Sequence, residues 1–147
     1  MQFTLRPAVE SDFDFAFQAK REALGPHIIA KWGWDETFQL AIHGNRWRER
    51  PWSIIESDGT AVGSVSVAEA ADHIRFGEFY LLPQFQRQGL GTNILLSVLA
   101  RSNDLSLPVR LEYLKWNPVG SLYRRHGFEV ISENDTHYFM ARQPHAR

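Results

Sequence analysis

The chain has 147 residues, with 16 lysines and arginines, 17 aspartates and glutamates, a net charge of −1 and no cysteine. This length suits one domain, residues 1–147, around a single core. The balanced charge argues against nucleic acid or anionic lipid as partners. Without cysteine there are no disulfides, thiolate metal sites or cysteine nucleophile.

The chain shows no sign of membrane insertion. Its first residues lack an apolar run of signal-peptide length, and the longest apolar stretch, residues 93–100, is too short to span a bilayer. We therefore expect a soluble, cytoplasmic protein that does not act at a membrane.

The first third of the chain predicts one strand and two helices, at residues 2–8, 10–24 and 35–49. Ser11 is the expected N-cap of the first helix, and Gly25-Pro26 is expected to end it. The second helix is expected to bury three residues, Phe38, Ala41 and Ile42.

Strands dominate the rest of the chain, at residues 52–56, 61–68, 74–82, 108–114, 128–133 and 136–142. Asp58-Gly59 is a hairpin signal between the first two. A helix with an apolar stripe begins near Leu90, and a short helix covers residues 117–127. This order predicts an α/β fold, with a mixed central sheet of about seven strands and helices on both faces.

The sequence QRQGLGT, residues 86–92, lies where a strand gives way to a helix. A helix N-terminus carries unpaired N–H groups and positive partial charge, and glycines let a ligand approach the backbone. These residues therefore predict a phosphate site, to which Arg87 adds charge. The alternative is an ordinary tight turn. A P-loop is excluded by its missing Gly-Lys-Ser/Thr, and a dinucleotide fingerprint by Ile94 in place of a third glycine.

Two blocks of sequence resemble the GNAT superfamily of acetyl-CoA-dependent N-acetyltransferases. The first is LLPQFQRQGLG, residues 81–91, and the second comprises Asn117, Pro118, Tyr123, Gly127 and Phe128. The predicted order of strands and helices also suits the GNAT fold, so the resemblance covers nearly the whole chain.

The resemblance implies transfer of an acetyl group from acetyl-CoA to a primary amine, by direct attack in a ternary complex. The acceptor would be a small-molecule amine or a peptide N-terminus, and the family allows a homodimer. Two alternatives stay open: a non-catalytic GNAT-like module that binds CoA or a partner, and an α/β interaction domain that makes no use of CoA.

The resemblance also implies which residues hold CoA. The loop would bind the pyrophosphate, the end of the preceding strand would bond the pantetheine arm, and an asparagine would contact that arm. These residues are Leu81, Leu82, Gln86, Arg87, Gln88, Gly89, Leu90, Gly91, Thr92 and Asn117.

Two residues are candidates for proton transfer. The resemblance gives Tyr123 the role of protonating the leaving thiolate, and the alternative is a core aromatic. Alternation along residues 74–82 makes Glu78 the lone carboxylate of an apolar row, which suggests a base acting directly or through a water. Its alternative is an ion pair with an arginine or lysine. The family places a bulge in this strand, and Gly77 permits one.

The acceptor decides how strong a base is needed. Deprotonating a lysine-type amine at pH 7 costs about 4.6 kcal/mol, against about 1 kcal/mol for an α-amine. The candidate acceptor residues are Trp32, Trp34, Glu36 and His137, with Asp35 as a further candidate. Alternatively, the tryptophans fill the core and the acids cap the second helix. The six histidines show no ligand spacing, so we expect no metal.

Overall fold

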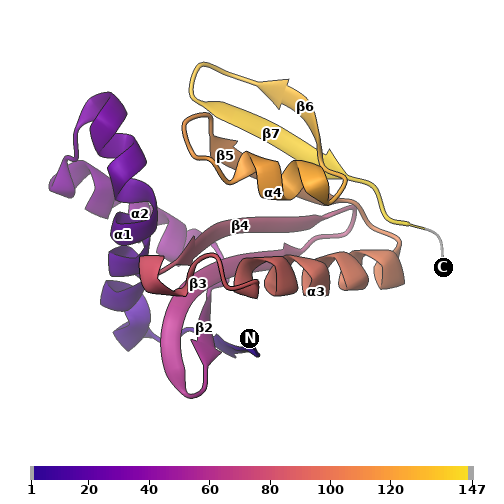
Figure 1. The fold of residues 1–147 in the computed structure, drawn as a ribbon, viewed down its shortest axis with the longest axis horizontal. Coiled ribbons are helices and arrows are strands. Elements are labelled where there is room, and N and C mark those ends of the chain that lie inside the picture. Colours follow the sequence, from indigo (N-terminus) through magenta and orange to yellow (C-terminus); the bar gives the residue numbers. More distant parts are fainter. Residues whose placement is uncertain (1, 146–147) are drawn as a thin grey trace. The chain divides into compact units, whose positions relative to one another are not determined.

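The computed structural model describes residues 2–145, which divide into two compact units. One unit holds residues 2–67 and 78–91, and the other holds residues 68–77 and 92–145. Both units contribute strands and helices (Figure 1).

The first unit packs two helices together beside a set of strands. Its elements are β1 (Thr4–Pro7), the 3-10 helix η1 (Glu10–Asp12), α1 (Phe13–Trp32), α2 (Glu36–Glu49), β2 (Ser53–Ser57), most of β3 (Thr60–Glu69), the end of β4 (Ile74–Leu81) and η2 (Pro83–Phe85). His43 of α2 joins the two helices, because its ring lies 4.7 Å from that of Phe13 and 5.2 Å from that of Phe17. Trp52 packs against the same histidine at 5.4 Å.

The second unit centres on a short helix that packs on strands. It holds the start of β4, most of α3 (Leu90–Leu105), β5 (Val109–Leu114), α4 (Gly120–Arg125), β6 (Glu129–Glu133) and β7 (His137–Arg142). Tyr123 of α4 packs on Tyr113 of β5 and on Phe128, with both ring centroids 5.7 Å away. Arg142 of β7 reaches α3 through Asn103, at 3.0 Å.

The strands form a seven-stranded sheet in the order β1-β2-β3-β4-β5-β7-β6. β4 and β5 pair in parallel, whereas the pairs β1–β2, β2–β3, β5–β7 and β6–β7 are antiparallel. The expected α/β fold, with a mixed sheet of about seven strands flanked by helices, is therefore confirmed.

Two local predictions, the hairpin turn between β2 and β3 and the apolar stripe of α3, are confirmed by the structure. Asp58 and Gly59 both have positive φ, at 53° and 77°, as the tight hairpin between β2 and β3 requires. The predicted stripe of α3 is buried at every position: Leu90, Ile94, Leu95, Val98 and Leu99.

The predicted end of the first helix is wrong, since α1 continues through Gly25-Pro26 as far as Trp32. Proline normally disfavours helical backbone at the preceding residue, because its ring meets that residue's Cβ. Gly25 has no Cβ, which removes much of that clash. The Trp34 ring fills the space instead, 3.6 Å from where a Cβ would lie.

The start of α1 and the buried face of α2 also differ from prediction. Ser11 does not cap α1; instead Asp12 accepts a hydrogen bond from the Val9 backbone N–H at 2.8 Å and pairs with Arg6. In α2, Phe38 is 59% exposed, and the buried residues are Gln39, His43 and Gly44. The aromatic contacts of His43 with α1 outweigh the apolar character of Phe38.

At Gly63 the backbone of β3 lies close to that of β4, which leads to a stability prediction. A Cβ at this position would overlap the Tyr80 carbonyl oxygen and lie 3.1 Å from the Leu81 Cα. Because these are backbone atoms, the strands must separate to admit a methyl group. We expect Gly63→Ala to lower the free energy of unfolding by about 1–3 kcal/mol in urea denaturation.

Ser64 provides the matched control on the same strand. Its buried hydroxyl has no hydrogen-bond partner among the described residues, so Ser64→Ala should cost little or stabilise. Equal unfolding midpoints for Gly63→Ala and the unmodified protein would contradict the close approach.

Candidate active site

The loop before α3 has the backbone of an anion site. Arg87 and Gly89 have left-handed backbone, with φ of 63° and 79°, and α3 begins at Leu90. Successive backbone N–H groups in a turn can form a concavity that binds anions. Nothing lies within 4 Å of a Cβ built on Gly89, so this point of the loop is open. Its assignment to the pyrophosphate of CoA stays a prediction.

Two glutamine side chains make hydrogen bonds that stabilise this loop. The side-chain amide of Gln86 donates to the Leu81 carbonyl at 2.9 Å, and that of Gln88 donates to the Gln84 carbonyl at 3.0 Å. Both side chains therefore fix the loop, which leaves the backbone and Arg87 to face an anion. Gly91 packs closely, with Phe79 3.4 Å from where its Cβ would be.

The predicted pantetheine contacts, Leu81 and Leu82, lie at the end of β4 and are both buried. The Leu82 N–H donates to the Val62 carbonyl, and the Leu82 carbonyl accepts from the Phe85 N–H, each at 2.9 Å. A carbonyl oxygen has a second lone pair, so both leucine carbonyls retain the capacity to accept another bond. Their pairing with pantetheine stays a prediction.

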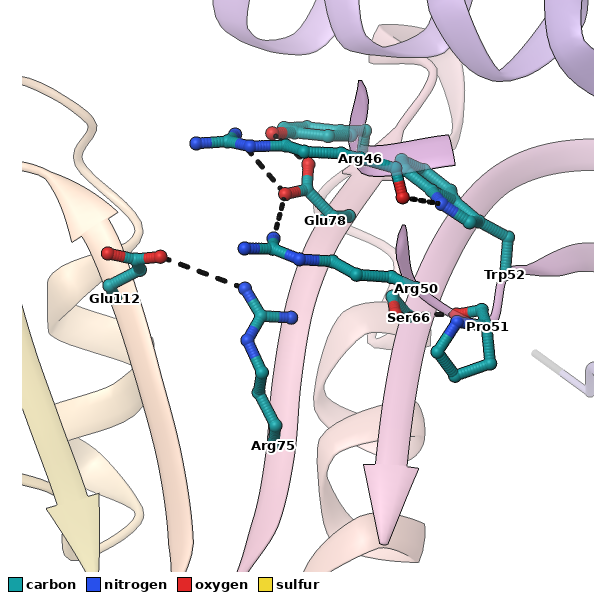
Figure 2. Close-up of polar contacts among 9 residues, drawn as sticks. Arg46, Arg50, Pro51, Trp52, Ser66, Arg75, Glu78 and Glu112 are labelled. Carbon is teal, nitrogen blue, oxygen red and sulfur yellow. Dashed lines mark hydrogen bonds and ion pairs between the residues drawn. The ribbon is translucent and has the colours of Figure 1, made fainter. Parts of the chain in front are cut away.

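Glu78 is a buried acid of the first unit with three described side-chain partners. Figure 2 shows two guanidinium groups meeting at its Oε1 atom, Arg50 at 2.5 Å and Arg46 at 3.2 Å. Its Oε2 atom accepts a hydrogen bond from the Tyr80 hydroxyl at 3.1 Å. The alternative that sequence left open for Glu78, an ion pair, is therefore present in the structure.

The backbone at Glu78 is left-handed, with φ of 49°, which is rare for a residue with a side chain. The expected irregularity of this strand thus falls on Glu78 rather than on Gly77. It breaks the alternation, because Leu81 and Leu82 are both buried beyond it. Such strain persists only where the surrounding structure enforces it, and it is typical of functional sites.

The end of α2 is held firmly, which fixes both arginines. The Trp52 indole N–H donates to the Arg46 carbonyl at 3.0 Å, and the Ser66 hydroxyl donates to the Pro51 carbonyl at 2.5 Å (Figure 2). Arg50 is the C-cap residue of α2.

Lys20 of α1 adds a buried cation to this region. Its side chain is nearly inaccessible, and burial lowers the pKa of its ammonium to about 8, opposed by the charge of Glu78 and assisted by that of Arg46. Burial also lowers the pKa of His43, whose Nε2 lies 3.3 Å from the Phe13 carbonyl.

This shift predicts a pH-dependent stability. The unfolded chain keeps Lys20 protonated up to about pH 10.4, whereas the folded protein releases that proton near pH 8. The unfolded state therefore binds more protons between these values, and stability rises with pH there. Between pH 7 and pH 9 we expect Lys20 to add about 1.4 kcal/mol to the free energy of unfolding, measured by urea denaturation.

Lys20→Met is the comparison that isolates this group. The charge of Lys20 helps to lower the pKa of His43, but that histidine is neutral above pH 7, so between pH 7 and pH 9 the difference between the two profiles reports mainly Lys20. Parallel profiles from pH 7 to pH 9 would contradict the shifted pKa.

Tyr123 and Asn117 lie in the second unit. Tyr123 is buried, and burial raises the pKa of its phenol well above the ordinary value, so it is protonated at neutral pH. Asn117 uses its side-chain oxygen to accept from the Val119 N–H at 3.1 Å, which shapes the turn into α4. Thr92 lies half-buried in the first turn of α3.

The described acceptor candidates of the first unit each have a different partner. Trp34 packs against Phe17 with centroids 6.3 Å apart, Glu36 pairs with Arg21, and Asp35 caps α2 by accepting from the Phe38 N–H at 3.0 Å. These contacts match the structural alternatives. The side chain of Trp32 lies outside the described residues. His137, in the second unit, contacts the Thr136 hydroxyl at 2.7 Å.

Sequence reasoning missed three residues that surround Glu78: Lys20, Arg46 and Arg50. A signal existed for each. Lys20 stands four residues from both Ala16 and Leu24 on the buried face of α1, and the arginines are four residues apart at the end of a predicted helix.

Comparison with known proteins identifies the family of this chain. The family described as "Acetyltransferase (GNAT) domain" matches residues 48–130, which is more than half of the chain. The chain belongs to the GNAT acetyltransferase family. This GNAT protein is therefore an acyl-CoA-dependent acetyltransferase. No curated protein matches it significantly in sequence.

Solved structures share the fold over nearly their full length. The PaiA N-acetyltransferase of Thermoplasma acidophilum, in complex with coenzyme A, has a TM-score of 0.77 at 17% identity, covering 97% of this chain and 99% of that one. The ribosomal-protein-S18-alanine N-acetyltransferase of Escherichia coli gives 0.70 at 17%, with coverages of 99% and 97%. An acetyltransferase of Thermus thermophilus gives 0.74 at 14%, with 97% of each chain covered.

Among residues 2–145 of this GNAT protein, none of the helices is long and apolar enough to cross a bilayer. Within the same residues, no three histidines, aspartates or glutamates gather in a way that suits a metal ion.

Proposed function

We propose that this GNAT protein transfers the acetyl group of acetyl-CoA to a primary amine by direct attack. The amine nitrogen bonds to the thioester carbonyl carbon, the carbon–sulfur bond breaks, the amine gives up a proton and the thiolate accepts one. The observation that carries the proposal is the family match together with the left-handed backbone of Arg87 and Gly89 before α3.

The backbone of residues 88–92 would hold the pyrophosphate, with the help of Arg87. Leu81 and Leu82 would bond the pantetheine arm as a neighbouring strand would, and Asn117 would contact the same arm. The contribution of these groups is to hold the acetyl carbon where an amine can reach it, which supplies much of the rate.

Tyr123 and Glu78 would move the two protons. The Tyr123 phenol is protonated at neutral pH, as a donor to the leaving thiolate must be. Glu78 would take the proton of the amine, directly or through a water. Its Oε2 atom accepts one described hydrogen bond, from Tyr80, and so retains a lone pair.

The acceptor of the proposal is a small-molecule amine or a peptide N-terminus. Among the structural neighbours, one acts on the alanine of a ribosomal protein and another is described as a phosphinothricin N-acetyltransferase. We place the reaction in the cytoplasm, without a metal, and allow a homodimer.

Release of thiol from acetyl-CoA, followed with a chromogenic thiol reagent, tests the proposal against a panel of amino acids, peptides, polyamines and aminoglycosides. The chain has no cysteine, so it gives no background signal. Turnover with one chemical class supports the proposal. Binding of acetyl-CoA without turnover across the panel would favour a non-catalytic GNAT module instead.

A further inference from the structure

The surroundings of Glu78 carry more positive charge than that residue can balance. We call Lys20, Arg46, Arg50, Glu78 and Tyr80 the Glu78 cluster. It contains three cations and one carboxylate, and at neutral pH Lys20 is still mostly protonated. Of the other acids in the described part of the first unit, Asp12 and Glu56 pair with Arg6 and Glu36 pairs with Arg21, while Glu49, which precedes Arg50 at the end of α2, is exposed to solvent.

The excess positive charge lies partly on side chains that solvent can reach. The Glu78 side chain is only 4% exposed, whereas those of Arg46 and Arg50 are 31% and 22% exposed. Each guanidinium has five N–H donors, and Glu78 occupies one nitrogen of each, Nη1. Both arginines therefore keep donors at a partly open surface, and α2 holds them four residues apart.

We infer that the Glu78 cluster binds the carboxylate of the acceptor, so that the substrate is an α-amino acid or an amine with an equivalent carboxylate. This inference rests on the proposed acetyl transfer. A planar carboxylate suits the fork of a guanidinium, which is why arginine favours such partners. The ammonium of the same molecule would then lie toward Glu78, the carboxylate that accepts its proton.

The same charges disfavour polyamines as acceptors. A diamine brings a second ammonium into a region that already holds an excess of cations, and like charges repel at close range. An amino acid brings a carboxylate, whose negative charge the same cations attract. We therefore expect the protein to distinguish amino acids from diamines by the charge of the second group that each molecule carries.

The test compares each free amino acid with its α-carboxamide, which removes the carboxylate charge and also makes the α-amine easier to deprotonate, so that without a carboxylate site the amide would react faster. Thiol release and calorimetric binding to the CoA-bound protein are measured for both, with putrescine as the diamine. We expect the amino acids to bind and react at least about tenfold better than their amides, because hydrogen bonds to charged groups are strong.

Substitutions in α2 test whether Arg46 causes the preference for amino acids over their amides. Arg46→Gln should raise KM for the amino acid about tenfold with little change in kcat, and should remove the preference over the amide. Arg46→Lys keeps the charge but loses the fork, so it should restore the preference in part. Arg48→Gln is the matched control, because Arg48 is an exposed arginine of the same helix that bonds Asn45 at 2.6 Å.

Each outcome decides the inference. Turnover of putrescine or of amides at the level of amino acids, or equal KM values for Arg46→Gln and Arg48→Gln, would overturn the carboxylate site while acetyl transfer stands. Absence of turnover with every amine would contradict the proposed function. In that case, carboxylate-dependent binding lost in Arg46→Gln would still support the site, and its absence would overturn it.

Discussion

Replacing Gly89 with aspartate is expected to weaken binding of CoA on the order of 100-fold. Aspartate tolerates the left-handed backbone that Gly89 adopts, and the space around its Cβ is open, so the loop should keep its shape. The new carboxylate would stand where the pyrophosphate is expected. Repulsion between close charges of like sign is worth a few kcal/mol at a protein surface, which corresponds to that loss.

Gly89→Asn is the matched control for this change. Asparagine has nearly the same size and the same tolerance of positive φ, but it carries no charge. Isothermal titration calorimetry with CoA should therefore show near-normal affinity for the asparagine variant. Equal losses in the two variants would mean that shape, not charge, explains the effect, and equal retention would remove this loop from the CoA site.

Tyr123→Phe should lower kcat on the order of 100-fold, the usual contribution of a general acid. Phenylalanine keeps the ring that packs between Tyr113 and Phe128, so the fold should hold. The phenol itself is lost, and with it the proton for the leaving thiolate. Steady-state thiol release gives kcat, and urea denaturation shows that stability is retained.

Tyr113→Phe controls for loss of a hydroxyl in the same aromatic group. The Tyr113 hydroxyl is buried and has no hydrogen-bond partner among the described residues, so its removal should leave kcat unchanged. If Tyr123→Phe keeps full kcat, the residue is a core aromatic and the acid lies elsewhere. A non-catalytic module would show no turnover in any of these proteins.

Most of the fold was predictable because local signals and tertiary packing agree. The apolar stripe of α3 and the turn at Asp58-Gly59 needed only periodicity and turn chemistry. α1 was misjudged at Gly25-Pro26, where a tertiary partner, Trp34, occupies the space that glycine leaves. α2 was misjudged because His43, not Phe38, contacts the neighbouring helix.

The part of the candidate site that consists of backbone groups could be predicted from the sequence. The part that consists of long side chains from distant segments could not. The loop around Gly89 follows from glycine spacing and a helix start. The arginines that reach Glu78 come from a helix about thirty residues earlier in the chain, and nothing in the local sequence pairs them with that acid. Only the three-dimensional structure shows that the lone acid of β4 lies within a group of cations.

The proline inside α1 has a consequence for how that helix opens. Because Pro26 has no N–H, the Glu22 carbonyl lacks its usual helical donor, and the ladder of hydrogen bonds is interrupted there. The turns before the break are anchored by Ala16, Phe17, Ala19 and Lys20, all buried. The turns beyond it bury one of the described side chains, Ile28, so they can unfold locally at a smaller cost, and backbone amides after residue 26 should exchange with solvent deuterium earlier than those of residues 17–24.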